Sequence, residues 1–258
     1  MSTGLADAPG RLDVAMVEIG LATSRHRAQL AIATGRVTIK GVPAGKPSQM
    51  VTAGDRIDVV DEPWVSRAAH KLIGALDDTG ITVPSRCLDA GASTGGFTQV
   101  LRIRGAEVVY AVDVGHGQLA PQIASDRRVV AREGLNIKNL SLGDLDGLPV
   151  GLAVADLSFI SLRLVLPALL PLVVAGGDAL LLVKPQFEVG RERLGSSGVV
   201  RDEALREGVV DAVCEAAACL GWATAWRGPS RVLGAHGNVE YFVHLRQESR
   251  HGLVGAAR

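Results

Sequence analysis

DAGASTGGF, residues 89–97, is the stretch of this sequence that decides the fold. It follows a short apolar run and opens a helix-like segment, which predicts a tight turn between a strand and a helix. Its three glycines would let the backbone approach a ligand closely. Phe97 stands where a Walker A loop has lysine, and the glycine spacing departs from G-x-G-x-x-G. A nicotinamide site and a Walker-type phosphate site are therefore disfavoured.

Apolar runs bounded by turns recur on both sides of this stretch. They have the length and composition of buried strands, and helices are predicted between them. One helix is predicted to be capped by Ser66, and another to span residues 202–220. The pattern predicts an α/β fold with a doubly wound, Rossmann-like sheet. The predicted strands are residues 87–88, 108–112, 152–155 and 180–183, with a final pair at 223–226 and 239–245.

The first sixty residues are organised differently. Two short helices are predicted before residue 35, and strands at residues 37–39 and 57–60 with a turn at 41–45 between them. This predicts a small α+β domain at the N-terminus, ended by a linker at Pro63-Trp64. The predicted boundaries are residues 1–62 for this domain, 63–66 for the linker and 67–258 for the α/β domain.

Basic residues gather in the N-terminal domain. A stretch that carries only positive charges suits contacts with RNA phosphates, although charge alone leaves an ordinary solvated helix face as the alternative. The whole chain gives no such signal, since it has 27 basic and 27 acidic residues. Between positions 25 and 46 no acidic residue interrupts the candidate RNA-binding residues Arg25, Arg27, Arg36, Lys40 and Lys46.

Composition excludes several classes of protein. Apolar residues make up 47% of the chain, enough for a packed core. The three cysteines, expected to be small buried residues, have no metal-ligand spacing, so no metal site is predicted and a reduced cytoplasmic protein is expected. The first ten residues lack an apolar signal core. The most apolar run, residues 162–175, is shorter than the ~20 residues that a membrane span needs.

Two carboxylates near the turn point to the ligand. Asp113 ends the next predicted strand, 22 residues beyond Gly91, where an acid can bind a ribose diol. Asp89 adds a negative charge. Together they suit a ligand with a ribose, an amino group, a positive sulfonium and no phosphate, which describes S-adenosylmethionine. The glycines could also serve only to make a tight turn.

Four further charged residues stand where such sheets build catalytic sites. Asp156 and Lys184 end consecutive strand runs, and strand carboxyl ends line the ligand crevice. Lys71 lies on the helix before the first strand, and Glu240 opens the last. The carboxylates could compensate the lysine charges, and taken singly each residue could belong to an ordinary ion pair.

The order Lys, Asp, Lys, Glu resembles that of FtsJ/RrmJ-type ribose 2'-O-methyltransferases. With the N-terminal domain included, the chain resembles the TlyA family from about residue 11 to 246. The resemblance implies 2'-O-methylation of cytidine in ribosomal RNA with S-adenosylmethionine, on free RNA or a ribosomal subunit, and an alpha-L RNA-binding module at the N-terminus. It rests on SRAAHKL at 66–72, residues 89–97, ADLSFIS at 155–161, VKPQFE at 183–188 and GNVEYF at 237–242.

The resemblance also implies roles for individual residues. The implied catalytic residues are Lys71, Asp156, Lys184 and Glu240. The implied cofactor contacts are Asp89, Gly91, Ser93, Gly95, Phe97, Asp113 and, on the adenine side, Asn136. Lys184 is expected to act as a base or to steer the attacking ribose hydroxyl. The charge of Asp156 opposes loss of the lysine proton, so positioning is expected to contribute more than basicity.

Two departures from the family pattern concern its ends and linker. Pro63 stands before Trp64-Val65, where members often have arginine. The basic N-terminal extension and longer C-terminal tail that accompany methylation of both ribosomal subunits are absent here, which favours the large subunit alone.

Three other functions fit the sequence less well than ribose methylation does. Base methylation is disfavoured, since no Asn/Asp-Pro-Pro-aromatic motif or well-placed cysteine is present. Relatives are also labelled haemolysins, but no spanning or strongly basic amphipathic segment supports membrane activity. An RNA-binding assembly factor would need only the N-terminal domain, and the intact set of four charged residues argues against it.

Overall fold

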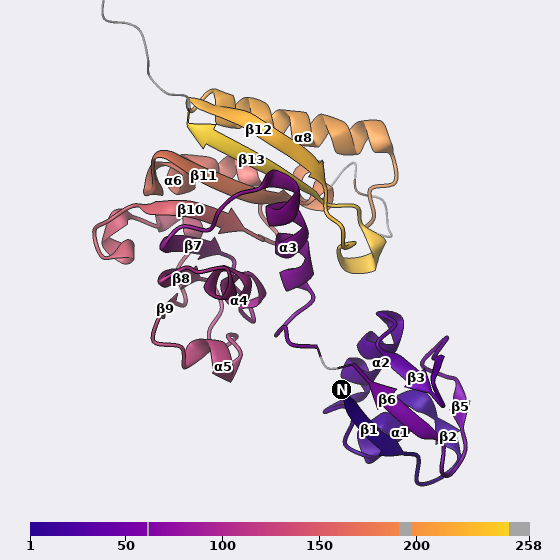
Figure 1. Ribbon diagram of the computed structural model, residues 1–258. Coiled ribbons are helices and arrows are strands. Elements are labelled where there is room, and N and C mark those ends of the chain that lie inside the picture. The colour runs from indigo at the N-terminus through magenta and orange to yellow at the C-terminus, as the bar shows by residue number, and fades with distance from the viewer. Residues whose placement is uncertain (61, 191–193, 195–197, 248–258) are drawn as a thin grey trace, which may run out of the picture. The chain divides into compact units, whose positions relative to one another are not determined.

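The computed structural model describes residues 1–60, 62–190, 194 and 198–247. The chain divides into two compact units, Met1–Pro63 and Trp64–Arg258 (Figure 1). Each unit has its own hydrophobic core. Within the described ranges, no helix is both long and apolar enough to cross a bilayer.

The N-terminal unit packs two helices against small antiparallel sheets. Its core is formed by buried aliphatic side chains of both helices and of the central strands, including Leu12, Met16 and Ile57. The four-stranded sheet has the order β1-β6-β3-β4, and β2 pairs with β5. The elements are β1 (Ser2–Leu5), β2 (Gly10–Arg11), α1 (Leu12–Glu18), α2 (Arg25–Ala33), β3 (Val37–Ile39), β4 (Val42–Pro43), β5 (Met50–Val51) and β6 (Arg56–Val59).

Two features of this unit differ from the sequence prediction. The predicted turn at 41–45 contains β4, which pairs with β3. Strand β1 was not predicted, because its four residues are mostly exposed and show no apolar alternation. Strand β1 forms because all four of its residues pair with β6.

The C-terminal unit is built on a seven-stranded sheet of order β12-β13-β11-β10-β7-β8-β9. Neighbours from β11 to β9 are parallel, and β13 is antiparallel to both β11 and β12. This confirms the doubly wound α/β prediction. The strands are β7 (Arg86–Ala90), β8 (Val108–Val112), β9 (Val129–Arg132), β10 (Val150–Ala155), β11 (Val173–Val183), β12 (Trp222–Pro229) and β13 (Tyr241–Gln247).

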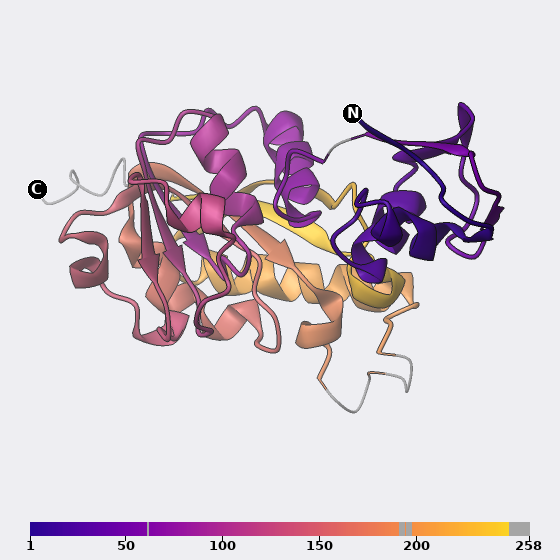
Figure 2. The same cartoon turned by 90° about the horizontal axis from the view of Figure 1, so that it is seen from below.

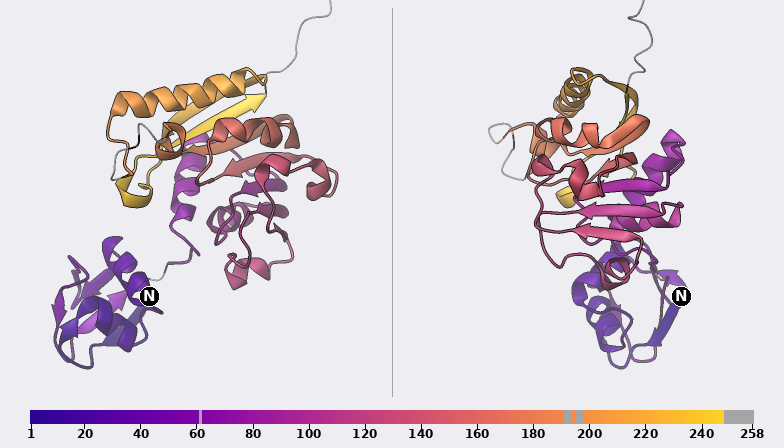
Figure 3. Two further views of the ribbon diagram at one scale, coloured as in Figure 1. Left: turned by 180° about the vertical axis from the view of Figure 1, so that it is seen from behind. Right: turned by 90° about the vertical axis from the view of Figure 1, so that its left-hand side faces the viewer.

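Helices cover both faces of this sheet (Figure 2). Along β10, Leu152 and Val154 face one core while Ala153 and Ala155 face the other, as the two-residue period of a strand requires. The first core includes side chains of α3 (Ala68–Thr79) and α4 (Gly96–Ile103). The second includes those of α6 (Leu166–Leu169) and α8 (Glu203–Ala218), and α8 runs along β12 and β13 (Figure 3).

Other short helices connect these elements. They lie in the loops that leave the strands and do not extend the two main layers. They are α5 (Pro121–Ala124), α7 (Pro185–Glu188), η1 (Ile137–Asn139), η2 (Leu142–Leu145), η3 (Leu162–Leu164), η4 (Leu170–Leu172) and η6 (Ala235–Gly237).

Helix boundaries in this unit follow local capping. The N-cap residue of α3 is Arg67 rather than the predicted Ser66, although the Ser66 hydroxyl accepts a hydrogen bond from Ala68 N at 3.3 Å. Asp202 is the N-cap of α8, and its side chain accepts a hydrogen bond from Leu205 N at 3.2 Å. Strand β9 was missed because it is a short, half-buried edge strand. Of the cysteines expected to be buried, only Cys87 is; Cys214 is half-buried and Cys219 is exposed.

Two leucines near α6 test the packing of the second core. Leu166→Ala should lower the free energy of unfolding by about 2–5 kcal/mol, because Leu166 is fully buried and its loss leaves a cavity. Leu164→Ala removes the same atoms two residues away, but Leu164 is exposed, so its effect should stay within about 0.5 kcal/mol. Denaturant unfolding measures both, and equal effects would contradict this description of the core.

Candidate active site

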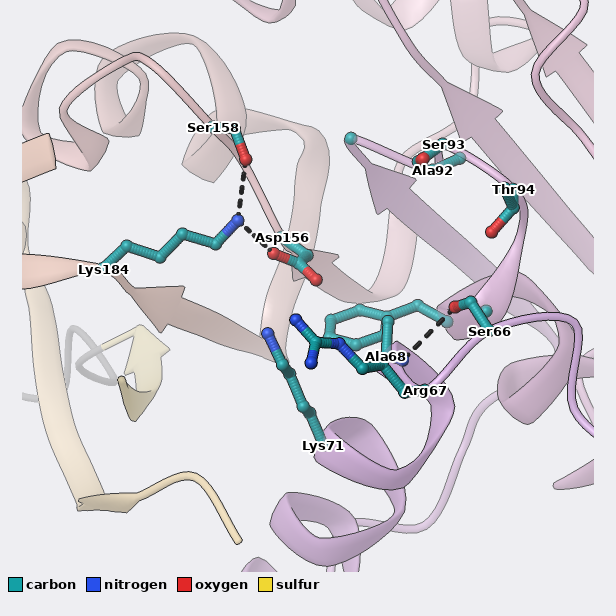
Figure 4. Close-up of a pocket in the computed structure, with 13 residues that line it drawn as sticks. Ser66, Arg67, Ala68, Lys71, Ala92, Ser93, Thr94, Asp156, Ser158 and Lys184 are labelled. Atoms are coloured by element: carbon teal, nitrogen blue, oxygen red, sulfur yellow. Dashed lines mark hydrogen bonds and ion pairs between the residues drawn. The ribbon is translucent and has the colours of Figure 1, made fainter. Parts of the chain in front are cut away.

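Two neighbouring cavities open at the carboxyl edge of the parallel strands. The first, of about 250 Å³, lies between the starts of α3 and α4 and the ends of β10 and β11 (Figure 4). The second, of about 520 Å³, lies beside the ends of β8 and β10. Gly91, Ser93, Asp156 and Ser158 line both cavities. The two cavities therefore form one continuous candidate site, at the crevice where doubly wound sheets bind ligands.

Lys184 and Asp156 form an ion pair in the first cavity. The Lys184 Nζ lies 2.6 Å from Asp156 Oδ1 and donates a hydrogen bond to the Ser158 hydroxyl at 2.9 Å. The side chains of the pair are 11% and 15% exposed, so both remain within reach of a ligand. Asp156 and Ser158 thus fix where the Lys184 ammonium group lies.

Lys71 and Glu240 form a second ion pair, which is more deeply buried. The Lys71 Nζ lies 2.6 Å from Glu240 Oε2, and the two side chains are 7% and 2% exposed. Gln186 Nε2 donates to the other Glu240 oxygen at 3.2 Å. The structure therefore brings together all four residues named as catalytic, and it resolves which carboxylate accompanies which lysine.

Arg67 adds a third cation to the first cavity. Figure 4 shows Arg67 and Lys71 extending from the start of α3 toward Asp156, with Lys184 approaching from the end of β11. Within the described part of the chain, Arg67 has no ion pair. Three cations face two carboxylates here, so the site suits an anionic substrate. Arg67, Ser158 and Gln186 were not predicted as site residues, although they lie in the motifs SRAAHKL, ADLSFIS and VKPQFE.

The glycine-rich turn joins β7 to α4, as predicted. Gly91 has φ +85°, and a Cβ atom there would lie 2.8 Å from the carbonyl oxygen of Asp156. Only glycine allows the turn to lie this close to the end of β10. Val65, at the entry to α3, is fixed beside α4 because its N–H donates to the Gln99 side chain at 2.8 Å.

Asp113 and Asn136 line the second cavity. Asp113 Oδ2 accepts a hydrogen bond from Ser93 N, and Oδ1 accepts one from Gly115 N, both at 2.8 Å. These bonds orient the carboxylate, and its remaining lone pairs are available to a ligand. The Asn136 side-chain Oδ1 caps η1 by accepting a hydrogen bond from Lys138 N at 3.0 Å. Both residues, which the sequence resemblance implies as cofactor contacts, line this cavity.

Three other expected cofactor residues lie mainly behind the cavity walls. Asp89 is fully buried, and Thr98 Oγ1 donates to its Oδ2 at 2.6 Å, which connects β7 to α4. Gly95 is the N-cap of α4. Phe97 reaches the first cavity but is almost wholly buried, with its ring stacked on that of Phe242 at a centroid distance of 6.2 Å. These residues support the turn more than they line the site.

An exposed aromatic side chain stands beside Lys184. Phe159 is 90% exposed and has φ +65°, a conformation that costs free energy in a residue with a bulky side chain. Its ring centroid lies 5.0 Å from that of Phe187, and the Lys184 Nζ lies 5.9 Å from the Phe187 centroid. The site therefore carries an aromatic surface next to its cations.

The predicted RNA-binding residues of the N-terminal unit are partly neutralised. Acidic residues from outside the stretch 25–46 reach three of them: Asp13 pairs with Arg25 at 3.3 Å, Glu62 with Arg36 at 3.5 Å and Asp55 with Lys40 at 2.6 Å. Within the described ranges Arg27 and Lys46 have no ion pair. An uninterrupted basic stretch in sequence is therefore a more mixed surface in the fold.

Among the described residues, no three or more His, Cys, Asp or Glu side chains lie together in a group that could hold a metal ion.

Comparisons with known proteins agree with this geometry. Residues 64–247 match the model of the FtsJ-like methyltransferase family, and residues 10–57 match the S4 domain. The chain is 49% identical over 247 residues to the 16S/23S rRNA (cytidine-2'-O)-methyltransferase TlyA of Mycobacterium tuberculosis, covering 94% of this chain and 92% of that one. It is 37% identical over 237 residues to Hemolysin A of Brachyspira hyodysenteriae, covering 91% and 99%.

A solved structure is similar to this chain over almost its whole length. A protein from Streptococcus thermophilus, labelled as a hemolysin, superposes with a TM-score of 0.73 at 37% sequence identity. The match covers 95% of this chain and 90% of that one, so it includes both units. The hemolysin label and the methyltransferase label thus occur among relatives of one architecture.

Asp89 should make stability depend on pH. Burial raises the pKa of Asp89 to about 7, while the Thr98 hydrogen bond opposes that rise. Because the folded pKa exceeds the unfolded value, the folded protein binds more protons, and stability from this group is lost as pH rises from about 4 to 7. Asp89→Asn should remove that loss, so its unfolding free energy should vary less with pH. Denaturant titrations at a series of pH values measure this dependence. Glu107→Gln, at an exposed carboxylate, should leave the slope of unfolding free energy against pH as it is in the natural protein. An unchanged slope in Asp89→Asn would contradict the prediction.

Proposed function

The chain belongs to the FtsJ-like methyltransferase family and to its TlyA branch. We propose that it uses S-adenosylmethionine to methylate the ribose 2'-oxygen of a cytidine in ribosomal RNA. The observation that carries this proposal is that two lysines of the first cavity, Lys71 and Lys184, each form an ion pair with a carboxylate. An rRNA substrate, free or within a ribosomal subunit, implies that the enzyme acts in the cytoplasm.

The residues of the second cavity fit the adenosine half of S-adenosylmethionine. Asp113 would accept hydrogen bonds from the ribose diol, and Asn136 would contact the adenine. The close turn at Gly91 would let the methionine portion pass toward the first cavity. When bound, S-adenosylmethionine supplies a methyl group activated by a positively charged sulfur. Asp89, Gly95 and Phe97 would hold the shape of the turn.

The first cavity would hold the ribose of the target nucleotide. Lys184, fixed by Asp156 and Ser158, would bind the 2'-hydroxyl and steer its lone pair toward the methyl group. As the 2'-oxygen forms its bond to the methyl carbon and the carbon–sulfur bond breaks, the hydroxyl would become strongly acidic, and its proton would pass to the Asp156 carboxylate beside the Lys184 ammonium group. Lys71 and Glu240 would keep α3 in place against β13, so that the cavity retains its shape.

Other groups would bind the RNA around the target. Arg67 at the mouth of the first cavity would contact a phosphate, and Phe159 offers a face on which a base can stack. We assign residues 1–62 as the RNA-binding module, 63–66 as the linker and 67–258 as the methyltransferase domain. In the module, Arg25, Arg27, Arg36, Lys40 and Lys46 would contribute phosphate contacts.

Lys184 is the residue whose loss should affect chemistry most selectively. Lys184→Ala should lower transfer of a radiolabelled methyl group to ribosomal RNA by at least about a hundredfold, since positioning of the nucleophile is lost. Lys184→Arg should fail as well, because the planar guanidinium places its donors differently. Lys138→Ala, at an exposed lysine on η1, should keep full activity. Normal turnover by Lys184→Ala, measured with RNA and cofactor binding intact, would remove Lys184 from the mechanism.

Asp113 should matter for cofactor binding without RNA. Asp113→Ala should weaken the binding of S-adenosylmethionine by about ten- to a hundredfold, the usual effect of losing hydrogen bonds to a charged group. Titration calorimetry measures this directly. Asp211→Ala, which removes an exposed carboxylate on α8, should bind as the natural protein does. Unchanged affinity in Asp113→Ala, or tight binding of NAD instead, would contradict the assignment of the second cavity.

A further inference from the structure

A buried carboxylate in the N-terminal unit gathers two arginines and a glutamine. Asp13, in the first turn of α1, has a fully buried side chain. Its Oδ1 accepts from Arg11 Nε at 3.0 Å, and its Oδ2 accepts from Arg11 Nη2 at 3.0 Å, from Gln29 Nε2 at 2.8 Å and from Arg25 Nη2 at 3.3 Å. The Arg11 hydrogen bonds, followed by those of Gln29 and Arg25, hold the pKa of Asp13 far below its usual range.

Arg11 and Arg25 each bind Asp13 with part of the guanidinium group and expose the rest to solvent. Although Asp13 is buried, the side chains of Arg11 and Arg25 are 44% and 59% exposed. Arg11 uses one edge of its guanidinium in a two-point contact, which defines the plane of the group. Most of the N–H donors of both arginines remain available to a ligand. The cluster therefore presents two oriented guanidinium groups rather than two mobile ones.

The charge ratio distinguishes this cluster from the other ion pairs of the unit. Lys40 and Arg36 each pair with one carboxylate, Asp55 and Glu62 respectively. At Asp13 two cations share one carboxylate, so a positive charge remains. Burying a carboxylate carries a desolvation cost that its partners must offset, and a single arginine with Gln29 could do so. The second arginine is thus available for another role.

We propose that Asp13 is a positioning residue that holds Arg11 and Arg25 as a paired receptor for backbone phosphates of folded RNA. The proposal rests on the proposed function only in taking RNA as the ligand. It adds Arg11, which lies outside the basic stretch 25–46, to the RNA-binding surface. The guanidinium pair would bind phosphate oxygens through oriented N–H donors, with less loss of side-chain freedom than two unrestrained arginines.

Neutralising Asp13 separates this proposal from simple electrostatics, because the two predict opposite signs. Removing a negative charge beside two arginines would, by Coulomb attraction alone, strengthen RNA binding. If Asp13 positions the arginines, Asp13→Asn in the full chain should instead weaken binding to a transcript of large-subunit ribosomal RNA by about tenfold. Loss of oriented phosphate contacts should also make the dependence of affinity on salt less steep.

Asp7→Asn is the matched control. It makes the same charge change at an exposed carboxylate of the same unit, and it should leave RNA affinity equal or slightly stronger. Asp13→Asn binding as tightly as the natural protein, or more tightly, would overturn the proposal. Measuring binding without methyl transfer keeps this outcome distinct from failure of the proposed function, which would appear as absence of 2'-O-methylation by the natural protein.

A second variant, Arg11→Lys, tests the proposal even if Asp13→Asn does not fold. It keeps the charge and the pairing with Asp13 but loses the two-point contact that orients the guanidinium. The proposal predicts weaker RNA binding by this variant too, with an unchanged circular dichroism spectrum and unchanged S-adenosylmethionine binding. Full RNA affinity in Arg11→Lys would show that orientation is irrelevant and would overturn the proposal equally.

Discussion

A buried ion pair joins the first helix of the C-terminal unit to its last strand. Lys71 and Glu240 are 169 positions apart in sequence, yet their charged atoms lie 2.6 Å apart and almost wholly out of water. Neither charge could be buried alone, since removing one partner from such a pair typically costs about 3–5 kcal/mol. Lys71 lines the first cavity and Glu240 directly precedes β13, so the geometry of the site depends on the contact between α3 and the start of β13.

The second ion pair serves a different purpose because a ligand can reach it. Lys184 and Asp156 come from the ends of adjacent parallel strands, and the cavity exposes part of both side chains. Gly91 lets the turn lie close against the end of β10 and connects this pair to the second cavity. One pair thus maintains the shape of the site, and the other faces the position proposed for the reacting ribose.

The sequence predicts the sheet and the position of the site better than it predicts the side-chain contacts within the site. Charged residues after apolar strand runs predict a site, because the carboxyl ends of parallel strands share one edge. Which carboxylate accompanies Lys71 depends on β13 lying beside β11, and that strand order is a long-range property. Phe97 was expected to contact the cofactor, but its ring stacks on that of Phe242, which comes from a distant part of the sequence. The pairing of Arg25 with Asp13 escaped prediction for the same reason, since the carboxylate comes from another helix.

The proposed chemistry is tested most directly by mapping ribose methylation on ribosomal RNA. Ribosomal subunits, or their RNA, would be incubated with S-adenosylmethionine with and without this protein, and each nucleotide scored for resistance to alkaline cleavage. A methylated 2'-oxygen cannot attack the adjacent phosphate, so the account predicts one newly resistant cytidine that depends on the protein. Methyl transfer to a base, with every ribose still cleavable, would contradict the account.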